Sequence, residues 1–376
     1  MPPSRSSGRR LARIFGIDIR FHMGWIVILG LIGFTLASYF AALNPHWSEL
    51  VVVLAAVITT VLFFVAVVLH ELAHSLVARA HGLPVDVITL FIFGGVSELT
   101  REPDDAGSEF KIAIAGPLLS LILGGALYAW GRSGNLHLPL YAVLEWLGYI
   151  NLLLAVFNLI PGFPLDGGRV LRAILWGANK DFVRSTRWAT QVGKICSIGF
   201  ILWGVFDFFS GGVLDGLWLV FIGWFLLSAA EQSWRQTEIQ TALRHYTVRD
   251  LETPFFRRVA PNVNLEEFIS ELADQHQFRA SLVLDQDDHL LGIITAADLA
   301  RIPRAQWGTT LVRAAMVPRD EMATVMPGEG LTSALQKMAE HNIAQLPILA
   351  NGGVRGIIRR DRIIELLHTN LAGGHS

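Results

Sequence analysis

The chain has 376 residues, of which 52% are hydrophobic and only 16% are charged, and its net charge is −2. A soluble protein of this length usually carries more charge, and a nearly neutral balance gives no indication of a nucleic-acid partner. The length exceeds what a single hydrophobic core normally supports, so we expect two domains. The single cysteine, Cys196, excludes a disulfide within a monomer.

Six apolar stretches approach or meet the roughly 20 residues that a helix needs to cross a bilayer. Basic residues gather before the first stretch and in the connections that fall on the same side, whereas the opposite connections carry only Arg132. By the positive-inside rule this predicts a multi-pass protein of the cell membrane with both ends of its membrane domain in the cytoplasm. The membrane domain covers residues 23–232, after a cytoplasmic tail over 1–22, and the stretches lie near 23–43, 50–78, 110–130, 139–160, 193–209 and 213–231.

A further apolar stretch, residues 87–96, is too short to cross the bilayer and contains Phe93, Gly94 and Gly95. Irregular backbone is tolerated at membrane depth only where its polar groups are paired or buried in protein. We therefore expect a small re-entrant or interfacial β-hairpin here.

The second apolar stretch ends in the pentad His70-Glu71-Leu72-Ala73-His74. Two histidines four residues apart project from one face of a helix and can supply two imidazoles to one Zn²⁺. Glu71, beside them, can act as a general base towards the water that hydrolyses an amide. A cluster of ionisable residues within a membrane span is a functional site by default. The alternative is a pair of interfacial histidines with a glutamate that reaches towards water.

Zinc requires a third protein ligand if its fourth position is to stay open to water. The best donor is Asp166, in the segment Asn-Leu-Ile-Pro-Gly-Phe-Pro-Leu-Asp-Gly-Gly-Arg that closes the fourth apolar stretch. Pro161 and Pro164 disfavour a continuing helix, so we expect Asp166 on non-helical backbone, on the same membrane side as His74. The alternative is a helix N-cap after a proline-rich turn.

The pentad and the Asp166 segment together resemble the site-2 proteases, a family of zinc intramembrane metalloproteases, over about residues 20–232. The resemblance implies an endopeptidase that cleaves the transmembrane segment of a single-span membrane protein, in regulated intramembrane proteolysis. Gly116-Pro117 also fits the family pattern, but Ser120 stands where relatives often have asparagine. The implied roles are zinc ligand for His70, His74 and Asp166, general base for Glu71, and binding of the substrate backbone or oxyanion for Asn158.

A transmembrane substrate hides its peptide bonds in its own helical hydrogen bonds and must unwind before attack. An extended segment then needs a partner strand, and glycines allow close approach of two backbones. We therefore expect Gly94 and Gly95 to bind the substrate by adding it to the hairpin as a strand. A simple tight turn is the alternative.

From Thr247 the charge rises and the chain repeats itself, since Gly292-Ile-Ile recurs as Gly356-Ile-Ile. Each repeat predicts a helix (265–275; 331–340), two strands (281–284 and 290–294; 346–349 and 354–358) and a closing helix, and two such units should pack together. The repeats resemble a tandem pair of cystathionine-β-synthase (CBS) modules, which in other families bind adenine nucleotides and regulate an attached membrane domain. The expected ranges are 247–306 and 307–370, after a linker at 233–246.

The first repeat contains Gly292-Ile-Ile-Thr-Ala-Ala-Asp, which matches the CBS nucleotide motif. The resemblance implies that Asp298 bonds the ribose and Thr295 meets the phosphate of ATP or AMP. The second repeat has Arg359 and Arg362 at these positions, so we expect at most one well-formed site. A dimerisation module without ligand is the alternative.

The predicted fold is thus a polytopic α-helical membrane domain with a small β-hairpin, followed by an α/β tandem CBS module. The function class that competes with the protease is a metal transporter or channel gated by the CBS pair. A permeation site, however, has no need of a glutamate directly after the first histidine, as Glu71 is here.

Overall fold

The computed structural model describes residues 9–91, 94–99, 102–134, 138–254, 256–271, 280–287, 289–341, 343–350 and 353–373. The chain divides into two compact units, Met1–Thr237 and Glu238–Ser376. The first unit contains the apolar helices and the second contains the two repeats.

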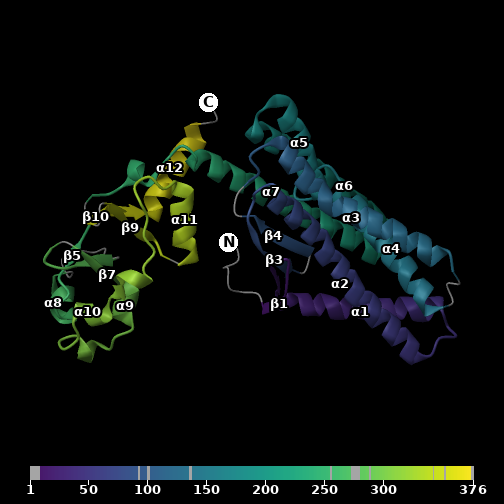
Figure 1. The fold of residues 1–376 in the computed structure, drawn as a ribbon, viewed down its shortest axis with the longest axis horizontal. Helices are drawn as coiled ribbons and strands as arrows, with labels where there is room; N and C mark the ends of the chain where they lie inside the picture. The colour runs from purple at the N-terminus through teal and green to yellow at the C-terminus, as the bar shows by residue number, and fades with distance from the viewer. Residues whose placement is uncertain are drawn as a thin grey trace. The chain divides into compact units, whose positions relative to one another are not determined.

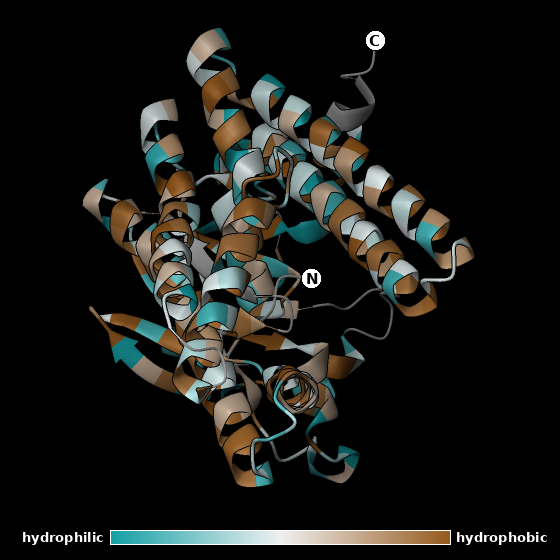
Figure 2. Cartoon of the chain, turned by 90° about the vertical axis from the view of Figure 1, so that its right-hand side faces the viewer, coloured by the Kyte–Doolittle hydropathy of each residue, from teal (hydrophilic) through white to brown (hydrophobic). Residues whose placement is uncertain are grey.

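Six helices among the described residues are long and apolar enough to cross a membrane. Hydrophobic residues recur along these helices (Figure 2), and large side chains such as Phe34, Phe206 and Leu214 are exposed. Helices that expose large apolar side chains are typical of a protein surrounded by lipid. The predicted polytopic helical domain is confirmed; the helices are α1 (Gly24–Leu43), α2 (Glu49–Ala80), α3 (Ala106–Arg132), α4 (Pro139–Asn158), α6 (Phe182–Phe209) and α7 (Val213–Leu243), as labelled in Figure 1.

Two of these helices extend beyond the apolar stretches that predicted them. α6 begins at Phe182, where the side chain of Asp181 caps it by accepting from the N–H of Arg184 at 2.9 Å. α7 continues to Leu243, through most of the segment expected as a linker. The additional turns carry charged and polar residues such as Arg184, Arg187 and Gln232, so a search for apolar runs does not detect them.

A four-stranded sheet in the order β1-β2-β3-β4 lies beside the helices. β1 (Arg9–Ile14) and β2 (Ile17–Phe21) form an antiparallel hairpin within the segment that we expected to be only a tail. The hairpin forms because Ile17 is fully buried against Leu72 of α2 and Ile88 of the sheet. The expectation of a tail is therefore wrong for residues 9–21.

The expected hairpin near residues 87–96 is present as the other half of this sheet. β3 (Val85–Phe91) pairs parallel with β2 and antiparallel with β4 (Gly94–Leu99), with Leu90 opposite Gly95. Phe93 lies outside the described residues. Since β2 already covers one side of β3, β4 is an edge strand of the sheet.

Small residues allow α3 and α4 to pack closely. A β-carbon on Gly131 of α3 would lie 2.6 Å from the Cα of Glu145, and one on Gly124 would lie 2.7 Å from the backbone nitrogen of Leu152. Close backbone approach through glycine is a common way for membrane helices to associate. A short helix, α5 (Asp166–Asn179), follows α4 after a turn.

The second unit is the predicted mixed α/β module. One four-stranded sheet has the order β5-β6-β7-β8, and β9 and β10 form a separate antiparallel pair. Strands β6, β7, β9 and β10 and helix α11 lie where the repeats predicted them. The elements are η1 (Val248–Leu251), β5 (Arg258–Val259), α8 (Leu265–Ser270), β6 (Ala280–Leu284), β7 (Leu290–Thr295), α9 (Ala296–Ala300), η2 (Arg304–Gln306), α10 (Val312–Ala315), β8 (Val317–Pro318), η3 (Arg319–Glu321), α11 (Leu331–Glu340), β9 (Gln345–Ala350), β10 (Gly353–Arg359) and α12 (Arg360–Gly373).

The two repeats bury apolar surface against each other. Leu282 and Leu290 of the first repeat belong to one hydrophobic cluster with Leu349 and Ile357 of the second. Each repeat also has its own core, around Phe268 and Met338 respectively. The expected packing of the two repeats is therefore confirmed.

Candidate metal centre

α2 presents the two histidines of the pentad on one face. The helix begins after Ser48, whose hydroxyl accepts from the N–H of Val51, and it ends before Gly82, which has a φ of +77°. His70 and His74 are each only 3% exposed, and their Nε2 atoms are 3.2 Å apart. One helical turn thus places two imidazole nitrogens at a single point inside the protein.

Asp166 completes the cluster from the start of α5. Its Oδ2 atom lies 3.1 Å from Nε2 of His70 and 3.1 Å from Nε2 of His74. Four zinc ligands at about 2.0–2.1 Å in a tetrahedron lie roughly 3.3–3.4 Å from one another. The three donor atoms, which the sequence analysis proposed, therefore form one face of a tetrahedron of the size that zinc requires.

The backbone at Asp166 differs from our expectation. Asp166 is the first residue of α5, after Leu165 in an extended conformation, so the prediction of non-helical backbone at Asp166 is wrong. Two glycines allow the new helix to begin so close to the preceding turn: a β-carbon on Gly168 would lie 2.7 Å from the carbonyl oxygen of Gly162, and one on Gly167 would lie 2.5 Å from the carbonyl carbon of Leu159. The glycines after Asp166 are thus a packing requirement.

The far nitrogen of each imidazole is bonded to α3. Nδ1 of His74 donates to the carbonyl oxygen of Ile112 at 2.6 Å. Nδ1 of His70 lies 2.9 Å from Oγ of Ser120, which can accept a hydrogen bond from it. A proton held on Nδ1 leaves the lone pair of Nε2 free for a metal. The hydrogen-bond partners of the two histidines are therefore on a helix that the pentad motif does not include.

Gly116, also on α3, provides the space for both imidazoles. A β-carbon at this position would lie 2.6 Å from Nε2 of His70 and 2.7 Å from Cδ2 of His74. Sequence reasoning assigned no role in the site to Gly116 or Ser120. The available signal was their four-residue spacing, which places both on one face of a helix.

Burial alone would raise the pKa of the Asp166 carboxyl. In the absence of a metal, the positive charge of a protonated His74 and the hydrogen bonds from Nε2–H of both histidines have the larger combined effect, and they hold this pKa well below its usual range. The carboxyl group is therefore ionised at neutral pH, as a metal ligand must be.

The carboxylate of the pentad lies against the sheet. A β-carbon on Gly95 of β4 would lie 2.9 Å from Cδ and 3.2 Å from Oε1 of Glu71. The edge strand of the hairpin and the proposed general base are thus adjacent. This arrangement requires glycine at residue 95.

Asn158 does not join the cluster directly. It is the last residue of α4, and its Nδ2 donates to the carbonyl oxygen of Leu154, in the same helix, at 3.0 Å. Among the described residues, none of its recorded hydrogen bonds reaches His70, His74 or Asp166.

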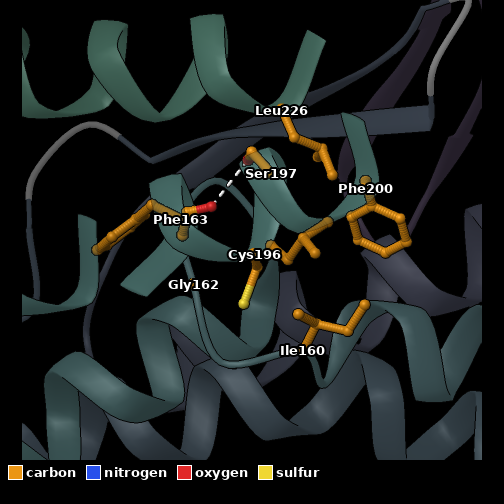
Figure 3. Close-up of a pocket in the computed structure, with 9 residues that line it drawn as sticks. Ile160, Gly162, Phe163, Cys196, Ser197, Phe200 and Leu226 are labelled. Atoms are coloured by element: carbon orange, nitrogen blue, oxygen red, sulfur yellow. Dashed lines mark hydrogen bonds between the residues drawn. The ribbon is translucent and has the colours of Figure 1, made fainter. Parts of the chain in front are cut away.

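The turn before Asp166 is supported by α6. A β-carbon on Gly193 of α6 would lie 2.8 Å from the backbone nitrogen of Phe163, and this nitrogen donates to the carbonyl oxygen of Ala189 at 3.4 Å. Figure 3 shows the residues around a small cavity beside this turn, with Cys196 and Phe200 in its wall. Glycine in α6 thus lets the turn lie directly on that helix.

The predicted nucleotide residues of the second unit bond to each other. Thr295 Oγ1 donates to Oδ2 of Asp298 at 2.6 Å, and the N–H of Thr295 donates to the same oxygen at 2.9 Å, which caps α9. A small cavity lies nearby, between strands of both repeats, with Ser281 and Gln345 in its wall. The Oγ of Ser281 is buried without a hydrogen-bond partner among the described residues.

Arg359 and Arg362, which occupy the corresponding positions in the second repeat, are also engaged locally. Nε of Arg359 donates to Asp361 at 3.0 Å, and Nη1 of Arg362 donates to Glu365 at 3.1 Å. The second repeat therefore does not reproduce the pair formed by Thr295 and Asp298.

Comparison with known proteins agrees with this geometry. The sequence matches the family described as Peptidase family M50 over residues 58–137 and 132–200, and the CBS domain over 248–304 and 312–369. The chain is 34% identical over 370 residues to sll0528 of Synechocystis sp., covering 96% of each chain. It is 31% identical over 359 residues to MJ0392 of Methanocaldococcus jannaschii, named a zinc metalloprotease, covering 95% of each. A solved structure of a site-2 protease from Methanocaldococcus jannaschii aligns with 34% identity over 61% of this chain and 95% of that chain, with a TM-score of 0.43.

Proposed function

Because the chain belongs to peptidase family M50, the site-2 proteases, and is a zinc metalloprotease with a C-terminal CBS pair, we propose that it cleaves membrane-spanning segments of other proteins. The observation that carries the proposal is the convergence of Asp166 on His70 and His74, which lie in a helix long enough to cross a membrane. Their donor atoms fit zinc, and a protease centre at this place acts on segments that lie within the bilayer.

Zinc bound by His70, His74 and Asp166 would polarise the scissile carbonyl and lower the pKa of the attacking water. Glu71 takes a proton from that water and delivers it to the leaving amine. The hydrogen bonds from the two histidines to Ile112 and Ser120 hold the imidazoles in place while the charge at the centre changes.

The substrate segment binds, in our proposal, to the free edge of β4. Unwound peptide has unpaired N–H and C=O groups that cannot remain unpaired inside a bilayer. An edge strand satisfies them by main-chain hydrogen bonds, and Gly95 brings that edge against Glu71. The substrate is a single-span membrane protein, and Gly94 and Gly95 allow its backbone to approach closely.

The metal ligands lie on the cytoplasmic side of the cell membrane in this proposal. The support is the distribution of basic residues, which favours a cytoplasmic position for both ends of the membrane domain. Asn158, at the end of α4, then lies at the same membrane level as the Asp166 turn that follows it. Its amide can turn from Leu154 towards substrate backbone or an oxyanion, which is the role we propose for it.

Replacement of Glu71 by glutamine tests the catalytic proposal. Glu71→Gln should bind zinc as the wild type does and should no longer cleave a co-expressed single-span membrane substrate. Glu49→Gln, at the opposite end of the same helix, is the matched control and should cleave normally. Normal cleavage by Glu71→Gln would falsify the protease proposal and favour the metal transporter or channel.

We also propose that the CBS pair binds an adenine nucleotide, at the cavity beside Ser281. The observation that favours it is a buried hydroxyl without a partner in the wall of a space between the repeats. The enclosed space is about 20 Å³, room for about one water molecule, so we place the adenosine at its mouth with the phosphates further out, and the surrounding side chains must move apart to admit the base. Asp298 and Thr295 would bind ribose and phosphate only after their mutual hydrogen bonds open.

Thermal unfolding of the purified chain with and without AMP or ATP tests this second proposal. A ligand that binds only the folded module should raise its unfolding temperature. Ser281→Val should remove the increase, whereas Ser333→Ala, at an exposed position of the same unit, should preserve it. If neither nucleotide changes the unfolding temperature and the chain dimerises through this unit, the module serves dimerisation instead.

A further inference from the structure

A buried ion pair lies a few residues from the metal ligands. The Nε atom of Arg172, on α5, donates to Oε1 of Glu109, on α3, at 2.7 Å, and Nη2 bonds the same oxygen. The side chain of Arg172 is 4% exposed and that of Glu109 is fully buried. Nη2 of Arg172 also lies 3.2 Å from Oε2 of Glu102, in the segment that follows β4.

The surroundings of Arg172 allow its guanidinium group one position. The rings of Phe163 and Phe182 lie 5.0 Å and 4.5 Å from its central carbon, which gives two cation–π contacts. The second carboxylate oxygen of Glu109 has no hydrogen-bond partner among the described residues. Glu109 therefore depends on Arg172, and loss of the guanidinium would leave its carboxylate buried and unpaired, whereas loss of the Glu109 charge would leave Arg172 with the exposed Glu102 alone.

Burial of such a pair is an expensive way to join two helices. Apolar side chains of similar volume often stabilise a protein as well as a buried ion pair, or better. Arg172 instead fixes the relative orientation of the carboxylates that it binds, because a guanidinium is planar and has several donors. A role in setting geometry fits these contacts better than a role in stability.

Each group bound by Arg172 belongs to an element of the proposed protease site. Arg172 lies on the short helix that begins with Asp166. Glu109 lies on the helix whose Ile112 carbonyl accepts from His74, less than one turn away. Glu102 follows the edge strand that carries Gly95.

We propose that Arg172 is a positioning residue that fixes the metal ligands through Glu109 and the substrate-binding edge of β4 through Glu102. The link through Glu109 fixes the position of α5, which begins with Asp166, relative to α3, whose Ile112 carbonyl accepts from His74. The second link, which rests on the proposed function, holds the start of the chain beyond β4 against α5. The two carboxylates therefore have separable effects, one on the metal and one on substrate binding.

The test uses the purified full-length protein in detergent, loaded with Co²⁺ for its visible spectrum. Glu109→Gln should change the ligand-field bands and weaken metal binding by up to about 10-fold, the lower end of what loss of a direct hydrogen-bond partner of a metal ligand costs, because Glu109 acts through Arg172. Glu102→Gln should leave the spectrum unchanged and raise KM for a membrane substrate, with kcat nearly constant. Glu231→Gln, which breaks the ion pair with Lys194 in the same unit, is the matched control and should change neither.

Arg172→Lys keeps the positive charge and is the variant to measure if Glu109→Gln fails to fold. A lysine cannot bond two carboxylates with a planar fork, so the Co²⁺ spectrum should again change. An unchanged spectrum and metal affinity in both variants, with only a lower unfolding temperature, would show that the ion pair is purely structural. An unchanged KM in Glu102→Gln overturns the second link.

These readouts separate this inference from the proposed function. The metal spectrum and affinity need no substrate, so the link through Glu109 is decided even if the wild type cleaves no membrane protein. The absence of cleavage in the wild type would instead count against the proteolytic function itself.

Discussion

His74 and the carbonyl oxygen of Ile112 are joined by a hydrogen bond of 2.6 Å between two different helices. A carbonyl group can only accept, so Nδ1 of His74 must carry a proton, and Nε2, which faces Asp166, is the nitrogen that can bind a metal. The proton on Nδ1 is therefore held by main chain, which no side-chain substitution in α3 can remove. His70 depends instead on a side chain, Ser120.

Ser120→Ala should weaken zinc binding, because Nδ1 of His70 loses its acceptor. Loss of such a partner typically costs about 10–100-fold in metal affinity. Competition with a chelator, followed by measurement of bound zinc, gives the affinity. Ser197→Ala, which removes a hydroxyl bonded only within α6, should bind zinc normally, and equal affinity in the two variants would contradict this role for Ser120.

Gly116→Ala should abolish zinc binding or reduce it strongly. The new methyl group would fall within 2.6–2.7 Å of ring atoms of both histidines, and α2 would have to move away from α3. Zinc stoichiometry of the purified variant measures the effect. Gly125→Ala is the control on the same helix, since no atom lies within 4 Å of its added carbon. Full zinc occupancy in Gly116→Ala is incompatible with the described packing.

Gly95→Val should retain zinc and lose cleavage. Its side chain would displace the Glu71 carboxylate, which lies about 3 Å from the position of a β-carbon, without touching the ligands. Gly94→Val tests the strand edge in the same way, and Gly30→Ala, at an open position of α1, is the control. Bound zinc and turnover are measured in parallel. Unimpaired cleavage in both hairpin variants would exclude strand addition at β4.

Gly193→Ala should loosen the turn that leads to Asp166. The added carbon would lie 2.8 Å from the backbone nitrogen of Phe163, and overpacking of this kind costs about 1–3 kcal/mol. We expect a lower unfolding temperature and faster loss of zinc to a chelator. Gly199→Ala, at an open position of the same helix, should change neither. If both variants behave alike, the turn does not depend on this contact.

The cluster of His70, His74 and Asp166 could be predicted from the sequence because the chemistry of zinc binding is restrictive. Few side chains bind zinc, the spacing of His70 and His74 fixes their direction on a helix, and Asp166 follows at the end of a span. The roles of Ser120 and Gly116 beside the histidines could not be predicted, because a hydroxyl and a missing side chain have many possible roles. Their function depends on which helices meet, and that is set by tertiary packing.

The N-terminal hairpin shows the same limit in the fold. Residues 9–21 contain too many arginines to suggest burial, and only the alternation of Ile17 and Ile19 indicates a strand. These two side chains are buried because β3, more than sixty residues later, lies beside them. Short strands that pair over such a distance have little local signal, whereas long apolar helices such as α2 carry their signal within one window.

The strand order β1-β2-β3-β4 restricts where an extended peptide could bind to the sheet. The inner side of the hairpin is closed by the N-terminal strands, so a guest strand can join near Glu71 only at β4. Alternate residues of a strand point to opposite faces. In a segment bound there, every second side chain would face the protein. The residue preferences around a cleavage site should therefore recur every two residues, and not at the spacing of three to four residues that the same segment has as a helix in the membrane.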